Sequence, residues 1–489
     1  MTVIDINRVY RNRWSLSWSF LLSILFILPF AINNNYFVDD WLRSDTGNSG
    51  WEENGRPLAS FMMSAMSLFP NGKNVFGDGS LLDVFPLTLI ISSALLVASA
   101  YAFCVQMDIT SRLKVFLICS LPVCNPFWVG NIQFRHDSAL MAASFLLAVL
   151  AAIASPRGRI MLLTSFAMLT ASLSLYQASI NAYIAMSICI IFNDYLRRDR
   201  FDIKLAFYLA LTILVSYVVY SKLVMPIAHL SDYAISNSKI LQLNKEFPLR
   251  VYNNFINYFR FLIDNSPRFY LTLWFVAIAA SIASCVKKFG FSLKALYCVL
   301  FIIILFLCSF GALSMFERPA IAPRTMMASS IIMMFLVYIS TGWSSTVTAT
   351  CSSAMIIISF IFSYIISGAM NAVERNDRFL ATQIASVYFK HYNADHKNIY
   401  ITGKPRLPKY ALRVTKSFGM ARYMVISAFN NYRFKYSLMS QYGISSGYPA
   451  PKIAEEYEIF LRKNDKQTIY SDALFDTFYY KDAIVFKFK

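Results

Sequence analysis

The densest group of side chains able to carry out chemistry lies in the first long polar segment, NNNYFVDDWLRSDTGNSGWEENGRPL, residues 33–58. Asp39 and Asp40 stand side by side directly after an apolar run. Adjacent carboxylates raise the pKa of one of the pair, which prepares it to accept a proton from a hydroxyl group. Carboxylates can also hold a divalent cation. The candidate catalytic residues are therefore Asp39 and Asp40, and the candidate substrate-binding residues of this segment are Arg43, Glu52, Glu53 and Arg56.

A structural interpretation of the same segment stays open beside the chemical one. The Asp pair then only caps a turn at the membrane surface, and Trp41 and Trp51 anchor the loop where lipid meets water.

Two shorter polar segments carry charges that can converge on the first. Arginine binds phosphate through two parallel hydrogen bonds, so arginines at the rim of a membrane protein suit a lipid-linked phosphate. Interfacial salt bridges are the competing interpretation. The candidates are Arg135, His136 and Asp137 in NPFWVGNIQFRHDSALM (125–141) and Glu317, Arg318 and Arg324 in MFERPAIAPRTMM (315–327).

The composition is that of a membrane protein. Of 489 residues, 57% are hydrophobic and 15% are charged, whereas soluble chains carry about 25% charged residues. A bilayer core of about 30 Å needs about 20 apolar residues per helix, and Pro122 and Pro126 predict a break in the third apolar stretch. The first stretch lacks the small-residue cleavage site of a signal peptide. The predicted spans are 14–32, 84–106, 115–130, 138–154, 160–176, 181–196, 204–224, 269–286, 295–314, 325–341 and 347–370.

The distribution of positive charge predicts the orientation. With the N-terminus inside, the inner segments hold 14 Lys and Arg against five Asp and Glu, and cytoplasmic loops are enriched in Lys and Arg. Three large segments then lie outside: 33–83, 225–268 and the tail, 371–489. The second contains an apolar stripe at helical spacing, which predicts an amphipathic helix resting in the outer interface. The stripe consists of Val251, Phe255, Tyr258/Phe259 and Leu262.

The tail predicts a separate α/β domain, so the chain divides into a transmembrane domain (1–370) and an outer domain (371–489). KNIYITGKP (397–405) is typical of a strand that ends in a glycine turn, and 467–489 contains two further strand-like runs. Half of the net charge of +18 belongs to this tail. On an outer face that charge suits an anionic saccharide, phospholipid headgroups or solubility, and not nucleic acid.

Several of these segments resemble the bacterial and phage O-antigen glucosyltransferase family that causes serotype conversion. The combination of the Asp pair with GRPL is the most specific part, and the resemblance runs over most of the chain. It rests on Tyr36-x-x-Asp39-Asp40-x-x-Arg43, Trp51, Gly55-Arg56-Pro57-Leu58, the stretch from Asn125-Pro126-Phe127 to Asp137-Ser138, Tyr176-Gln177-Ala178-Ser179 and Ile399-Tyr400-Ile401-Thr402-Gly403.

The resemblance implies a polytopic α-helical membrane protein of about 11 transmembrane helices, related to the GT-C glycosyltransferases, with a C-terminal periplasmic α/β domain. It implies a multi-pass enzyme of the bacterial inner membrane, with the N-terminus cytoplasmic and the C-terminus periplasmic. Such an enzyme moves a sugar, here glucose, from undecaprenyl phosphate to a hydroxyl of the lipopolysaccharide O-antigen, with inversion and with Asp39 or Asp40 as the base. The implied partners are a flippase, an enzyme that makes the lipid-linked donor, and membrane lipid. No cofactor is implied beyond a divalent cation that the carboxylates can hold.

Two other functions stay open from the residues alone. A transporter or flippase for a lipid-linked saccharide would place ionisable residues near the bilayer midplane and show repeated halves, and neither feature is seen. An O-antigen polymerase or ligase also has large outer loops rich in arginine, but it uses a pyrophosphate-linked oligosaccharide.

Overall fold

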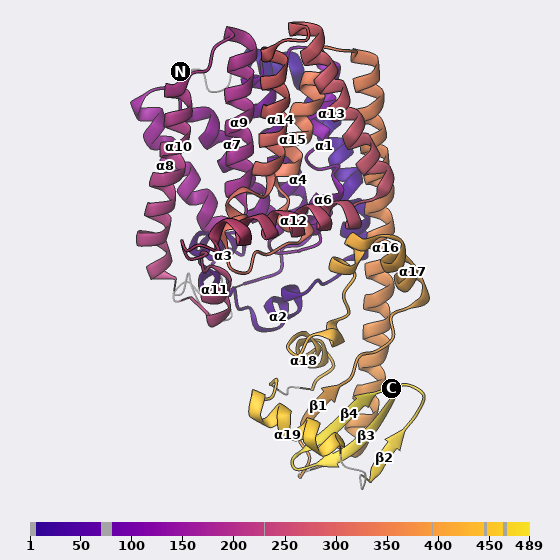
Figure 1. Cartoon of the computed structure of the whole chain (residues 1–489). Helices are drawn as coiled ribbons and strands as arrows, with labels where there is room; N and C mark the ends of the chain where they lie inside the picture. The colour runs from indigo at the N-terminus through magenta and orange to yellow at the C-terminus, as the bar shows by residue number, and fades with distance from the viewer. Residues whose placement is uncertain (1–5, 70–80, 229, 394, 445–446, 463–466) are drawn as a thin grey trace.

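The computed structural model describes residues 6–69, 81–228, 230–393, 395–444, 447–462 and 467–489. Its larger part is a bundle of helices, and a smaller unit of sheet and helices projects from one end of that bundle (Figure 1). Residues 70–80 of the predicted first outer segment lie outside the described part. The bundle is formed by α1 (Ile6–Asn33), α4 (Leu87–Gln106), α5 (Arg112–Ser120), α6 (Pro126–Ile132), α7 (Ser138–Ala154), α8 (Arg159–Leu175), α9 (Ser179–Arg198), α10 (Ile203–Val219), α13 (Arg268–Phe289), α14 (Leu293–Phe310), α15 (Ala328–Ser340) and α16 (Ser345–His391).

The predicted helical membrane class is confirmed in outline, but the count of eleven crossings is not. Seven helices of the described chain are long and apolar enough to cross a membrane, and α7, α8 and α15 are apolar but shorter. The predicted third span consists of two short helices, α5 and α6. Pro122 and Pro126 cause this break, because proline cannot donate the hydrogen bond that continues a helix. The seven long helices are α1, α4, α9, α10 with its extension to Ile227, α13, α14 and α16.

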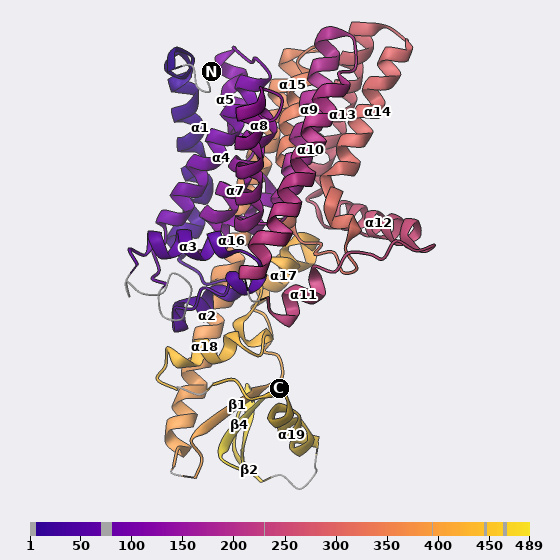
Figure 2. The same cartoon turned by 90° about the vertical axis from the view of Figure 1, so that its left-hand side faces the viewer.

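The segments predicted to lie inside meet at one end of the bundle. Arg8 forms an ion pair with Asp108 at 3.3 Å, and Arg197 donates to the Met107 carbonyl at 3.0 Å. The start of α1 lies at this end in Figures 1 and 2, and the C-terminal unit lies beyond the other. The bundle therefore separates the two sets of segments as the charge pattern predicts.

The opposite end of the bundle, which we call the outer end after the charge-based prediction, carries short helices instead of tight turns. Helix α12 (Phe247–Asn265) lies across this end (Figure 1). Its Tyr258 and Leu262 side chains, both in the predicted stripe, are buried together with Phe261. Asn254 fixes α12 to the segment after α14 by donating to the Ser314 carbonyl at 2.8 Å. The other elements here are α2 (Asp39–Thr46), η1 (Glu52–Asn54), α3 (Pro57–Met66), η2 (Tyr220–Val224), η3 (Met225–Ile227), α11 (Asp232–Asn237), η4 (Gly311–Met315) and η5 (Pro323–Thr325).

Helix α16 joins the bundle to the C-terminal unit without a break. Its 47 residues correspond to about 70 Å at 1.5 Å per residue, more than a bilayer core requires. Small side chains let its first half approach α1: Ser363 donates to the Phe26 carbonyl at 2.9 Å, and Asn33 donates to the Ser367 hydroxyl at 2.8 Å. The proposed domain boundary at 370 falls inside this helix.

The C-terminal unit is a four-stranded sheet with helices on both faces. The strand order is β1-β4-β3-β2, with β1 and β4 parallel and the other pairs antiparallel. Side chains alternate between the faces: Ile399 and Ile401 pack against α16, while Tyr400 packs against α19. The segment 467–489 forms three strands, so the prediction of two was wrong by one short edge strand. The elements are β1 (Asn398–Thr402), α17 (Lys409–Ser417), η6 (Gly419–Tyr423), η7 (Ala428–Asn430), α18 (Phe434–Ser440), α19 (Pro451–Arg462), β2 (Thr468–Ser471), β3 (Phe475–Tyr480) and β4 (Ala483–Phe488).

Candidate functional site

Helix α2 carries the Asp pair and lies between the outer end of the bundle and the C-terminal unit (Figure 1). Trp41 anchors it to that unit, because its indole is buried in the hydrophobic cluster formed by α16, α18 and the sheet. The Tyr36 ring stacks on Trp41 with centroids 4.8 Å apart. The backbone N–H of Tyr36 donates to Glu374 of α16 at 2.9 Å. The position of α2 therefore depends on the C-terminal unit as well as on the bundle.

On the bundle side, Asp137 is the centre of a buried charge cluster. Its two carboxylate oxygens accept hydrogen bonds from Arg43 at 2.5 Å and from the Trp51 indole at 2.6 Å. The Arg56 guanidinium lies 3.7 Å away. Burial alone would raise the pKa of Asp137, but the Arg43 and Arg56 charges and the Trp51 hydrogen bond together lower it. Asp137 is therefore ionised and holds the first outer segment against the start of α7.

The GRPL segment is fixed by the turn after α8. Arg56 donates to the Gln177 side chain at 2.9 Å and lies over the Tyr176 ring at 4.7 Å. Gly55 has φ +74°, and a Cβ there would lie 2.8 Å from the Tyr220 hydroxyl, which donates to the Gly55 carbonyl at 2.9 Å. Only glycine fits this conformation and this close contact. Two of the motifs that carry the family resemblance are therefore in direct contact.

Asp40 is fully enclosed. One carboxylate oxygen accepts the backbone N–H groups of Phe37 and Arg135, at 3.2 and 3.1 Å. The other oxygen is buried and has no hydrogen-bond partner among the described residues. Burial raises the pKa of Asp40 to about 8, against the opposing effect of the Arg43 charge. Asp40 is therefore mostly protonated at neutral pH, and it ties the turn before α2 to the segment before α7.

Asp39 has the opposite environment. Its side chain is 48% exposed, and its carboxylate lies 3.8 Å from the Arg43 guanidinium. A carboxylate that faces solvent beside a buried cation can be reached by a hydroxyl group of a substrate. Of the two candidate catalytic residues, only Asp39 faces the open side of the site.

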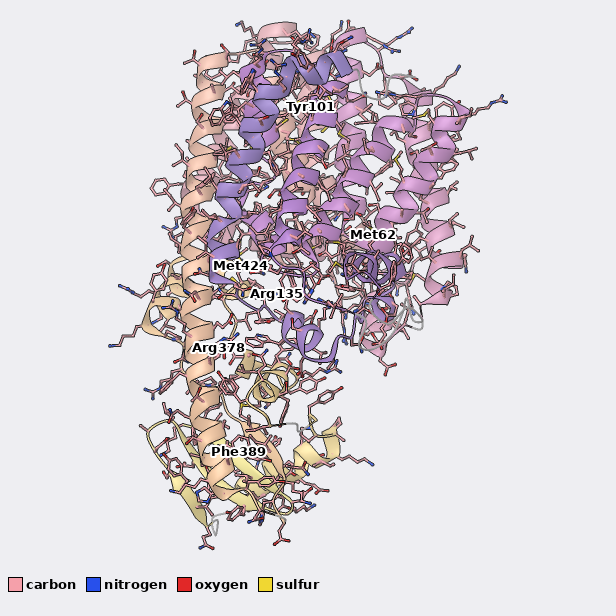
Figure 3. The ribbon with its side chains drawn as sticks, turned by 180° about the vertical axis from the view of Figure 1, so that it is seen from behind. Met62, Tyr101, Arg135, Arg378, Phe389 and Met424 are labelled. Carbon is pink, nitrogen blue, oxygen red and sulfur yellow. The ribbon has the colours of Figure 1, made fainter. Side chains whose placement is uncertain are left out.

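The three arginines predicted to bind phosphate differ in how far their donors are already used. Arg135 is buried at the outer end of the bundle (Figure 3). Its guanidinium pairs with Asp83 at 2.6 Å, donates to the Asn34 side chain at 2.9 Å and lies 4.1 Å from the Tyr36 ring centroid. These contacts leave Arg135 little capacity for a ligand.

Arg324 is less constrained. It is half-buried, its guanidinium lies 5.2 Å from the Phe134 ring centroid, and it forms no ion pair within the described residues. Arg324 lies close enough to Arg56 to affect its protonation. Burial lowers the pKa of Arg56, and the Arg324 charge acts in the same direction. Arg318 is exposed, also without an ion pair in the described chain.

The remaining acidic candidates are Glu52, Glu53 and Glu317. Glu52 accepts a hydrogen bond from Ser49 at 2.7 Å and another from Ser60, so it closes the loop on itself. Glu53 is exposed. Glu317 lies 4.0 Å from Lys239 of the second outer segment. The structure therefore joins Arg43, Arg56 and Asp137 directly, whereas Glu317 has a partner outside the cluster.

His136 is buried, with its Nε2 atom 3.3 Å from the Ser44 hydroxyl. Burial lowers the pKa of His136 to about 4, and the Arg43 charge acts in the same direction. His136 is therefore neutral at physiological pH and adds no charge to the cluster.

The sequence between residues 28 and 335 matches the family model described as Glucosyl transferase GtrII. This range contains α2, Asp137 and Arg324, and so all of the charge cluster. The chain belongs to the GtrII glucosyltransferase family. The resemblance to the serotype-converting glucosyltransferases is therefore confirmed. Membership in this family implies a glucosyltransferase that acts in O-antigen modification, and not a transporter.

A relative of this GtrII-family chain occurs in Salmonella phage P22. It is described as an uncharacterized 55.3 kDa protein in the gtrB 5' region, and it is 24% identical over 403 residues, which cover 78% of this chain and 80% of the phage protein. No solved structure matches the chain.

Sequence reasoning missed the residues of this glucosyltransferase that brace the site from a distance. Asp83 pairs with Arg135 from the far end of the first outer segment. Glu374 and Arg378 of α16 form an ion pair at 2.8 Å, and the Arg378 guanidinium lies 5.6 Å from the Trp41 ring. The spacing of Glu374 and Arg378, four residues apart, is a signal that the sequence contained.

The described part of the glucosyltransferase contains no group of three or more His, Cys, Asp or Glu side chains that could hold a metal ion. The divalent cation that the Asp pair predicts therefore stays a prediction.

Asp137→Asn is expected to lower the free energy of unfolding by about 3 kcal/mol, because Arg43 would keep a buried charge with only the more distant, half-exposed Asp39 beside it. Denaturant titration of the purified full chain in detergent measures this. The matched control is Asp45→Asn, an exposed acid of α2 whose replacement keeps an oxygen to accept the Ser440 hydrogen bond, and it should change the same quantity by less than about 0.5 kcal/mol. Equal stability of the two variants would contradict the role assigned to Asp137.

The raised pKa of Asp40 predicts a pH dependence of stability. Between pH 3.8, its ordinary pKa, and about 8, the folded chain holds a proton on Asp40 that the unfolded chain has lost. The contribution of Asp40 to the free energy of unfolding therefore falls as pH rises through this window. Asp40→Asn removes that contribution and should make the pH dependence less steep over the same range. His136, with its lowered pKa, contributes in the opposite direction in both proteins and cancels in the comparison. Parallel profiles of wild type and variant would show that Asp40 does not titrate in this way.

Proposed function

We propose that the chain transfers glucose from undecaprenyl phosphate to a hydroxyl of the lipopolysaccharide O-antigen, with inversion, on the periplasmic face of the bacterial inner membrane. Membership in a glucosyltransferase family supports the group that is transferred. The single observation that carries the mechanism is the exposed Asp39 carboxylate beside Arg43, above a buried charge cluster at the outer end of the bundle.

The orientation follows from charge. The end that gathers the basic segments faces the cytoplasm by the positive-inside rule. The opposite end, with α2 and the C-terminal unit, then faces the periplasm, where lipid-linked sugar and O-antigen meet. The resemblance adds a flippase and a donor-synthesising enzyme as functional partners, and a GT-C relationship for the transmembrane domain (1–370), with residues 371–489 as the periplasmic domain.

Asp39 is the proposed base. It accepts the proton of the acceptor hydroxyl while the hydroxyl oxygen forms a bond to the anomeric carbon of glucose. The bond between that carbon and the phosphate oxygen breaks on the opposite side, which inverts the configuration, and undecaprenyl phosphate leaves with the electron pair. Asp40 and Asp137 act as positioning residues, because neither reaches the surface and both hold the segment that carries Asp39.

Arg324 is the proposed donor of hydrogen bonds to the leaving phosphate. Negative charge develops on that phosphate as the bond breaks, and fixed cations stabilise it. The guanidinium is half-buried, unpaired within the described chain and close enough to affect the pKa of Arg56, so Arg56 is its natural companion. Arg135 is proposed to be structural, since Asp83 and Asn34 pair with its terminal nitrogens and its Nε is buried.

Asp39→Asn is expected to lower the rate of glucose transfer by about 100-fold or more, because an amide cannot accept the proton. Asp40→Asn keeps the acceptor oxygen for two backbone N–H groups and should lose less than about tenfold on the same scale of general-base effects. Mass spectrometry of O-antigen from cells that express each variant measures the added hexose per repeat, and transfer in isolated membranes measures the rate. Asp45→Asn is the control.

If Asp39→Asn retained the wild-type rate, the base assignment would be wrong. Altered O-antigen chain length instead of an added hexose would support a polymerase or ligase.

Arg324→Gln is expected to reduce the turnover rate by about 100-fold, with a smaller change in the donor concentration at half-maximal rate, because the lost interaction strengthens as the phosphate leaves. Transfer assays with varied lipid-linked donor separate the two quantities. Arg375→Gln, an exposed arginine of α16, is the matched control. A normal turnover rate for Arg324→Gln would remove Arg324 from the mechanism.

A further inference from the structure

A positively charged surface lies where the C-terminal unit meets the outer end of the bundle. We define the basic collar as residues 404–426, which comprise the segment after β1, α17, η6 and the turn that follows. Between Asp395 and Glu455 the chain contains ten Lys and Arg and no Asp or Glu. Six of these ten lie in the collar and all six are exposed: Lys404, Arg406, Lys409, Arg413, Lys416 and Arg422.

None of the six forms an ion pair within the described ranges of the chain. Elsewhere in the same unit, by contrast, exposed lysines form ion pairs. Lys481 pairs with Glu456, and Lys489 lies 3.1 Å from Asp476. A stretch of cations without any acid repels itself unless an external anion neutralises it. The collar therefore has the charge of a surface that meets an anionic partner.

Apolar side chains stand among these cations. Tyr410, Leu412, Tyr423 and Ile426 are all exposed. The opposite side of α17, with Ala411, is buried against the protein, so only the mixed basic and apolar side is free. Basic residues interleaved with exposed aromatic and aliphatic side chains are typical of segments that rest in a membrane interface.

The collar also lies level with the end of the apolar stretch of α16, where a bilayer would place its headgroups. The Tyr410 hydroxyl donates to the Ile365 carbonyl of α16 at 3.5 Å, and its ring lies against Gly368. Both residues belong to the last part of the apolar stretch that ends at residue 370. On its other side, Tyr423 packs on Phe261 of α12 with ring centroids 5.0 Å apart. Figures 1 and 2 show α17 beside α16 at the point where that helix leaves the bundle.

We propose that the basic collar binds the headgroups of anionic phospholipids in the adjacent leaflet and so holds the C-terminal unit against the membrane. Anionic lipid attracts basic segments at the membrane surface, and each cation adds to the attraction. An anionic saccharide is the competing occupant. The exposed Leu412 and Ile426 favour lipid, because aliphatic side chains gain by entering the acyl region and gain little from a hydrated glycan.

The consequence for the site follows from the position of α2. Trp41 is buried against α16 and α18, and Ser440 of α18 donates a hydrogen bond to Asp45 of α2. A collar held by lipid restrains the unit that holds α2. The lipid contact itself does not depend on the proposed reaction, so failure of one leaves the other untouched.

The test compares two charge variants of the purified full chain. The first neutralises the collar with Lys409→Gln, Arg413→Gln, Lys416→Gln and Arg422→Gln. The matched control removes four exposed cations without ion pairs in the described chain, from the end of α16, the segment before β1, and α19: Lys390→Gln, Lys397→Gln, Lys452→Gln and Arg462→Gln. Each protein, in neutral detergent, is titrated with short-chain phosphatidylglycerol and with short-chain phosphatidylcholine, and the shift of the thermal unfolding midpoint reports binding.

Wild type and control should bind phosphatidylglycerol in preference to phosphatidylcholine, and the collar variant should bind phosphatidylglycerol about tenfold more weakly or worse. Added salt should reduce the wild-type preference. Equal binding by the collar variant and the control would overturn the proposal.

Hydrogen–deuterium exchange locates the contact and does not depend on the variants folding. In nanodiscs that contain phosphatidylglycerol, peptides covering 404–426 of the wild type should exchange more slowly than in nanodiscs of phosphatidylcholine alone. Identical exchange in the two would overturn the proposal. Protection by a soluble anionic O-antigen fragment, but not by phosphatidylglycerol, would assign the collar to the saccharide instead.

Discussion

The buried ion pair between Arg43 and Asp137 holds together the end of the molecule where the candidate chemistry lies. Removing both charges from water costs several kcal/mol per ion, and the pair is stable only because its surroundings satisfy it. Arg43 donates also to the Ser49 carbonyl at 3.1 Å and lies over the Trp51 ring at 4.3 Å. Trp51 in turn donates to Asp137. One acid at the start of α7 thus fixes the positions of α2 and η1, two short elements of the first outer segment.

Two different supports meet at α2. The bundle supplies Asp137 and the backbone that encloses Asp40, and the C-terminal unit supplies the apolar contacts around Trp41. Between them, Asp39 is left exposed while its neighbour is fully buried. A helix of eight residues is marginal by itself, so its position is set by these tertiary contacts. The long α16, which passes from the bundle into the C-terminal unit and packs against its sheet, connects the second support to the first.

The sequence predicted the class of the molecule well, because hydropathy, proline and charge act locally. The break at Pro122 and Pro126, the amphipathic α12 and the separation of basic and polar ends all follow from such local rules. The number of crossings did not follow, since α7, α8 and α15 are too short to be assigned by length. The third strand of 467–489 was also missed, because a four-residue edge strand leaves little pattern.

By itself, the sequence determined the family, the helical membrane class and the loop that carries the acids, because motif, composition and charge are properties of neighbouring residues. Tertiary structure alone decided which of two adjacent, identical acids is enclosed and which faces outward. It also decided that the terminal nitrogens of Arg135 pair with Asp83 and Asn34, while Arg324 forms no ion pair within the described chain. The physical reason is the same in each case: burial and pairing depend on groups far apart in the chain, and these set whether a charge is available to a substrate.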